Sequence, residues 1–186
     1  MRVARAVDAS KTNPKEAALA RIATAIGKYW ICKRTPAFIN EAQECLGGIG
    51  YVEENILPRL YRQAPLNSIW EGSGNVQCLD VLRALHKEPE SKAALFDLLH
   101  SAKGRNACYD NHLQSLLDAF EDTATLEIRS RLITEHTAIA MQGALLLNES
   151  DSVMANTFCE ARLGKQQGLA FGTLPANAPF LDIIKK

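Results

Sequence analysis

The spacing of apolar residues limits this chain to a helical fold. Apolar side chains recur three and four residues apart along the whole sequence, whereas few runs alternate with the two-residue period of a half-buried strand. The segment Asn13-Pro14-Lys15-Glu16 predicts the start of a long helix, with an N-cap, a proline in the first turn and a capping-box glutamate. We expect an all-α fold, an antiparallel helical bundle with extra helices toward the C-terminus.

Proline and glycine divide this pattern into segments. An opening helix ends near Ser10, and the long helix from Pro14 is expected to kink at Pro36 and to stop at Gly47-Gly48. A short helix interrupted by Pro58 follows. Further helices are predicted over residues 72–86, 90–102, 105–121, 124–148 and 151–166, before a loop over 172–179. We expect residues 1–87 to carry the motifs described below and residues 88–186 to add helices to the same compact domain.

Composition favours one globular unit and excludes several classes of protein. The 186 residues are 47% hydrophobic, enough for one core, and 21 Lys+Arg balance 21 Asp+Glu, which excludes polycations and acidic disordered tails. No apolar run reaches the roughly 20 residues of a membrane span, and the N-terminus lacks a secretion signal. The five cysteines form no CxxC pair and the four histidines lack metal-ligand spacing. We expect a cytoplasmic protein with reduced thiols, no metal site and no membrane partner.

Two short motifs carry the candidate chemistry. The first is the loop around Gly47-Gly48, whose glycines permit positive φ and whose amides can hold an anion. Taken alone, a plain helix C-cap and turn is the simpler interpretation. The second is Glu71, which stands before Gly72-Ser73-Gly74 at the start of a predicted helix. A carboxylate there can act as a base or cap the first turn, and in isolation the cap is again the simpler reading.

Together the two motifs resemble the C-terminal helical domain of acyl-CoA dehydrogenases. That family carries Gln-x-x-x-Gly-Gly-x-Gly-Tyr and then aromatic-Glu-Gly-Thr/Ser, and the sequence has both in order, from Gln43 to Tyr51 and from Trp70 to Ser73. Segments such as 67–75 and 79–83 are similar to the AidB-like flavoproteins of the bacterial alkylation response. The resemblance covers nearly the whole chain and is strongest over residues 40–85.

The resemblance implies roles for the matching residues. Glu71 takes the position of the catalytic base, which removes the α proton of an acyl-CoA while the β hydride passes to FAD, so that an enoyl-CoA forms. Because part of the FAD site in this family comes from a neighbouring subunit, a homo-oligomer is implied. The positions that match FAD contacts are Gln43, Gly47, Gly48, Ser73 and Asn75.

Departures from the family pattern limit what the resemblance implies. Trp70 stands where tyrosine is more common and Ser73 where threonine is more common. The resemblance therefore does not imply the ordinary turnover of short-chain acyl-CoA. The N-terminal helical domain and the β domain, which build most of the flavin and acyl-CoA pocket in the family, have no counterpart in the sequence. We therefore expect a C-terminal fragment that is colourless and inactive by itself.

Two other functions stay open. Residues 1–40 hold eight basic residues against two acidic ones, so a DNA-binding, DNA-protecting domain is an alternative, although a solvated charged face explains the same charges. The candidate contacts to double-stranded DNA are Arg21, Lys28, Arg83 and Arg162. The third possibility is an oligomerisation module, a helical bundle whose apolar faces associate with a second copy.

Overall fold

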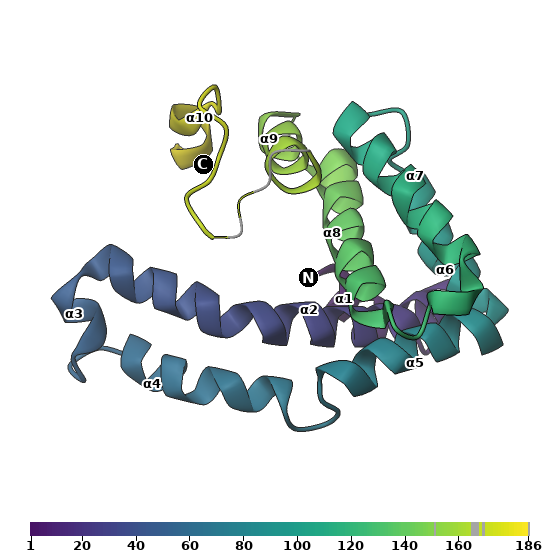
Figure 1. Cartoon of the computed structure of the whole chain (residues 1–186), viewed down its shortest axis with the longest axis horizontal. Coiled ribbons are helices and arrows are strands. Elements are labelled where there is room, and N and C mark those ends of the chain that lie inside the picture. Colours follow the sequence, from purple (N-terminus) through teal and green to yellow (C-terminus); the bar gives the residue numbers. More distant parts are fainter. Residues whose placement is uncertain (151, 165–167, 169, 186) are drawn as a thin grey trace.

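The structure, a computed structural model, describes residues 1–150, 152–164, 168 and 170–185, and these residues form helices and loops without a β-strand (Figure 1). The all-α prediction is confirmed. The helices are α1 (Arg2–Ala9), α2 (Pro14–Leu46), α3 (Gly48–Tyr51), α4 (Leu57–Gln63), the 3-10 helix η1 (Ala64–Ser68), α5 (Gly74–Lys87), α6 (Pro89–His100), α7 (Ala107–Glu121), the 3-10 helix η2 (Thr123–Thr125), α8 (Ser130–Glu149), α9 (Ser152–Leu163) and α10 (Phe180–Ile184).

Helix α2 begins and ends where the sequence indicates. The Asn13 side chain accepts hydrogen bonds from the backbone N–H groups two and three residues on, at 3.0 and 3.4 Å. Glu16 does not complete a capping box, because its carboxylate binds the Arg2 guanidinium at 2.6 and 2.8 Å and the Asn13 N–H already donates to a carbonyl of α1. Gly47 ends the helix with φ 63°, and the helix continues through Pro36.

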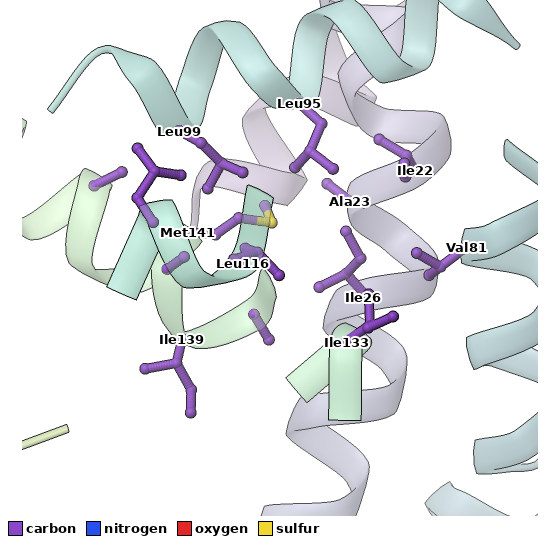
Figure 2. Packing of buried hydrophobic residues seen from close by; sticks show 14 of the residues in the cluster. Ile22, Ala23, Ile26, Val81, Leu95, Leu99, Leu116, Ile133, Ile139 and Met141 are labelled. Atoms are coloured by element: carbon purple, nitrogen blue, oxygen red, sulfur yellow. The ribbon is translucent and has the colours of Figure 1, made fainter. Parts of the chain in front are cut away.

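The core lies where the first half of α2 crosses the later helices (Figure 2). Ile22 and Ile26 of α2 are buried together with Val81 of α5, Leu95 of α6 and Ile133 of α8, each no more than 1% exposed. Full burial of such a side chain is worth about 1.5–3 kcal/mol. Because residues from before and after position 87 share this cluster, the two parts of the chain are stabilised by the same core.

Several helix extents differ from the prediction, most of them by one or two residues at an end. Pro58 lies in the first turn of α4 and does not interrupt a helix, since a proline without an N–H breaks no bond at that position. Helix α8 begins at Ser130 and not at 124, because Arg129 donates to the carbonyl of Asp122 at 3.0 Å and closes a turn there. The helix predicted over 151–166 is observed as Ser152–Leu163, and positions 151, 165 and 166 lie outside the described residues.

The second half of α2 leaves the core and runs beside α4, with α3 at the turn between them (Figure 1). We call residues 31–63 the arm. Several apolar side chains of the arm face solvent, among them Phe38, Ile49 and Tyr51, which are 63%, 69% and 80% exposed. Exposed apolar side chains gathered on one segment are typical of an interaction surface. Across the described ranges, none of the helices is long and apolar enough to span a membrane.

Candidate functional site

Glu71 lies at the entrance of α5 in a backbone conformation that few non-glycine residues adopt. Its φ is 54°, and the following Gly72 has φ 98°. The left-handed conformation costs a residue with a Cβ about 1–3 kcal/mol, so it persists only where surrounding contacts impose it. The Glu71 side chain is exposed to solvent.

Contacts from two helices impose this conformation. On one side, the Lys28 ammonium of α2 donates to the carbonyl oxygens of Asn67 and Trp70, the latter at 2.9 Å. On the other side, the Gln77 amide of α5 donates to the Glu71 carbonyl at 3.0 Å. The loop that carries the carboxylate is therefore fixed to α2 before Glu71 and to α5 after it.

Positive charge surrounds the N-terminal end of α5. Ser73 is the N-cap residue in an extended conformation, and Asn75 lies exposed in the first turn. Gly74 is buried against α2 and α8, where an added Cβ would lie 2.8 Å from Lys33 Cε and 3.4 Å from Arg131 Nη2. Among the described residues no carboxylate forms an ion pair with either cation. Free amide groups at a helix start beside two cations make a site for an anion such as a phosphate.

Sequence reasoning missed Lys33, Arg131 and Gln77. None of them belongs to a motif, and Lys33 and Arg131 are nearly 100 positions apart in the sequence. They meet at the start of α5 only because α2 and α8 both pack against that helix. No local sequence signal could have identified them.

The glycine loop is a tight turn at the tip of the arm. The buried Gln43 amide donates to the Gly50 carbonyl at 3.1 Å, and the Gly50 N–H donates to the Gly47 carbonyl at 2.9 Å. A Cβ on Gly50 would overlap the backbone carbonyl of Gln43, so glycine is required there. Gly48 has open space around it, and a cleft of about 630 Å³ opens beside Gln43.

The two motifs lie apart from each other in the chain. Ser73 and Asn75 are adjacent to Glu71, whereas Gln43, Gly47 and Gly48 gather at the tip of the arm. The start of α5 meets α2 at Lys33, and Gly47 lies 14 positions further along the chain. At 1.5 Å of rise per residue this is about 20 Å. One small chemical group cannot contact both motifs within a single chain.

The four candidate DNA contacts do not form an open basic patch. Arg21 makes a bidentate ion pair with Asp80, at 2.7 and 3.0 Å, and this guanidinium holds the pKa of the Asp80 carboxyl below its ordinary value. Arg83 binds the same carboxylate, and Lys28 is used by the loop before Glu71. Arg162 is half-buried and lines an apolar cavity. The arrangement gives no support to the DNA alternative.

Within the part of the chain that the structure describes, no cluster of three or more His, Cys, Asp or Glu could hold a metal ion.

Comparisons with known proteins agree with one another. Residues 1–86 match the family described as acyl-CoA dehydrogenase, C-terminal domain. AidB of Escherichia coli strain K12 is 43% identical over 172 residues, which are 90% of this chain and 30% of AidB. Acyl-CoA dehydrogenase family member 11 of Caenorhabditis elegans is 32% identical over 136 residues, which are 73% of this chain and 22% of that relative.

Two solved structures have the same helical arrangement. ACDH-11 of Caenorhabditis elegans, in complex with C11-CoA, matches 85% of this chain and 30% of its own, with a TM-score of 0.69 and 28% identity. Bd2924 in its apo form matches 78% of this chain and 29% of its own, with a TM-score of 0.63 and 30% identity. The chain spans no more than 30% of the length of these relatives.

Proposed function

This chain belongs to the acyl-CoA dehydrogenase family, and we propose a function from its correspondence to the C-terminal helical domain. It would serve the α,β-dehydrogenation of an acyl-CoA thioester in a larger FAD-dependent protein. The observation that carries the proposal is the carboxylate of Glu71, held at φ 54° beside a helix start that Lys33 and Arg131 approach. Backbone strain that neighbouring contacts maintain is common at catalytic positions.

The surroundings of Glu71 favour a base over a helix cap. Ser73 occupies the N-cap position of α5, and among the described residues the Glu71 carboxylate accepts no hydrogen bond from the first turn of that helix. The exposed carboxylate is therefore available to a substrate brought by the rest of a larger protein. The α proton of a thioester is only weakly acidic, so its base must stand within hydrogen-bond reach of it.

The start of α5 fits the pyrophosphate of FAD. Its free amides, together with Ser73 and Asn75, would hold the phosphate oxygens, and Lys33 and Arg131 would balance their charge. Gly74 suits this role because the absent Cβ leaves room for the Lys33 and Arg131 side chains to lie against the start of α5. Bound there, FAD would supply the hydride acceptor, and the chain would supply position and charge.

The glycine loop suits a second FAD, held by a neighbouring subunit. By helical rise, Gln43 lies about 15 Å and Gly47 about 20 Å from the start of α5, too far for the same pyrophosphate. The exposed apolar residues of the arm support an interface in this region, since they would be covered by a second copy. We therefore propose a homo-oligomer in which each arm reaches the flavin of its neighbour.

A chimera tests the proposal. The matching C-terminal part of AidB is replaced by this chain, and two quantities are measured: FAD content, and exchange of the acyl-CoA α proton with solvent deuterium. Glu71→Gln is expected to keep FAD and to slow the exchange about 100-fold or more, the usual contribution of a general base. Glu121→Gln, which changes an exposed carboxylate at the end of α7, is the matched control.

Two results would contradict the proposal. Equal exchange rates in the two variants would show that Glu71 is not the base. A folded chimera that contains no FAD would show that the start of α5 does not belong to a flavin site.

A further inference from the structure

A cavity of about 600 Å³ lies between α1, α2, α8 and α9, and Phe171 closes one side of it. The cavity opens to solvent, since Ile31 and Phe38 in its lining are 62% and 63% exposed, and its volume falls within the range of small-molecule sites. The cavity and the Glu71 loop lie on opposite faces of α2, because Gly27 and Arg34 line the cavity whereas Lys28 and Lys33 face the loop. The cavity is therefore separate from the site proposed above.

The polar side chains that line the cavity differ in whether they have a partner within the protein. Of its described lining residues, four are polar, and two of these are satisfied within α2 and α8. The Thr35 hydroxyl donates to a carbonyl of its own helix at 2.6 Å, and the Gln142 amide does the same at 3.0 Å. The other two are Arg34 and Arg162. Among the described residues no carboxylate lies within ion-pair distance of either guanidinium. The rest of the lining is apolar.

Aromatic rings hold one of these guanidinium groups at the cavity. The Arg34 guanidinium carbon lies 5.7 Å from the centre of the Trp30 ring and 4.6 Å from that of Phe171. Phe171 in turn packs edge-on against Phe38, with ring centres 6.1 Å apart. Burial, and then the charge of Arg34, lower the pKa of Arg162. Two like charges beside an apolar cavity are unfavourable unless an anion lies between them.

We propose that this cavity binds a fatty carboxylate, with the hydrocarbon chain between α2 and α8 and the carboxylate shared by Arg34 and Arg162. The planar guanidinium group matches a carboxylate with two parallel hydrogen bonds, which explains why two arginines without a carboxylate partner among the described residues stand beside an otherwise apolar cavity. The apolar lining, including Ile26 and Leu145, provides the contact for the chain.

The first test is a titration of the 186-residue protein with saturated carboxylates below their micelle-forming concentrations. Trp30 lines the cavity and is the fluorescent reporter in a Trp70→Phe background, since the sequence has two tryptophans. Binding is expected to be saturable, with Kd falling about fourfold for each added methylene from hexanoate to decanoate. Decanol and decylammonium are expected to bind at least about tenfold more weakly than decanoate. Equal affinity for decanol and decanoate, or no saturable binding, would overturn the proposal.

The second test uses variants. Arg34→Gln and Arg162→Gln are each expected to weaken decanoate binding about tenfold or more. Arg83→Gln is the matched control, because Arg83 is exposed and pairs with Asp80. Unchanged affinity in both cavity variants would overturn the proposal.

A third variant fills the cavity without removing charge. A Cβ on Gly27 would meet its nearest neighbours at 4.0 Å, so Gly27→Leu fits the backbone and also raises helix propensity. We expect a circular dichroism melting curve no less stable than that of the wild type and no decanoate binding. Wild-type affinity in Gly27→Leu would overturn the proposal. So would a dimer that Gly27→Leu dissociates, seen by sedimentation without decanoate binding, since a second copy would then be the occupant.

Discussion

Replacing Tyr109 by phenylalanine removes one hydroxyl group without changing the packed volume. Tyr109 is fully buried, and its hydroxyl donates to the Leu99 carbonyl at 2.6 Å. Leu99 lies in the last turn of α6, where backbone carbonyls have no donor within the helix. Burial raises the pKa of the Tyr109 hydroxyl, so the group stays protonated and remains a donor at neutral and moderately alkaline pH. Tyr109, which belongs to α7, therefore caps the C-terminal end of α6.

The cost of the substitution follows from this contact. A buried carbonyl that loses its donor costs about 1–3 kcal/mol. A loss of about 2 kcal/mol lowers the melting temperature of a domain of this size by roughly 4–8 °C. Calorimetry measures the shift, and urea unfolding with an unchanged m-value checks that the unfolded state is the same. The control is Tyr51→Phe, at a side chain that is 80% exposed, with an expected effect within about 0.5 kcal/mol.

One result would refute this account. If Tyr109→Phe and Tyr51→Phe melt at the same temperature, another group satisfies the Leu99 carbonyl and the end of α6 does not depend on α7. Gly143→Ala tests the packing of the same ring separately, because an added Cβ would lie 3.0 Å from Tyr109 Cδ2. Overpacking of this kind costs about 1–3 kcal/mol.

Three further predictions follow from other contacts. The rings of His112 and His136 stack with centres 5.0 Å apart, and burial lowers both pKa values below 6.5. The unfolded chain therefore binds more protons in acid, so the melting temperature should be level above about pH 6.5 and fall below it. An equal fall in the melting temperature after His112 and His136 are both changed to Asn would refute this. Gly50→Ala should displace α3 and speed tryptic cleavage of the arm at least tenfold, and an unchanged rate would contradict the tight turn. Lys28→Met should release the loop before Glu71 and increase iodide quenching of tryptophan fluorescence, whereas unchanged quenching would show that the two bonds are dispensable.

Features that depend on local chemistry could be predicted from the sequence. Asn13 and Gly47 bound α2 because an amide cap and a left-handed glycine act on the residues next to them. Glu16 departed from its predicted role because Arg2, on another helix, competes for its carboxylate. The same limit applies to the candidate site. Motif residues such as Glu71 could be identified, but the cations around the start of α5 come from helices whose packing no local pattern specifies.

The cavity gives a second example of a residue whose surroundings could not be predicted from the sequence. Arg162 stands out in the sequence as a basic residue on a helix expected to be exposed, which suggests a contact with DNA. In the structure it is half-buried beside Arg34, and the two come from helices that are far apart in sequence. The sequence gives the sign of a charge but not the residues around it in the fold, and those residues decide what the charged group can bind.

Helix α2 joins the core to the arm as one rod of 33 residues, about 50 Å long by helical rise. Its first half is clamped by tertiary packing, whereas its second half relies mainly on its own hydrogen bonds and on α4. Amide hydrogens beyond Thr35 should therefore exchange far faster than those between Leu19 and Tyr29. Docking of the arm would suppress that fraying, so the free energy of any assembly includes the entropy lost when the last three turns of α2 stop opening.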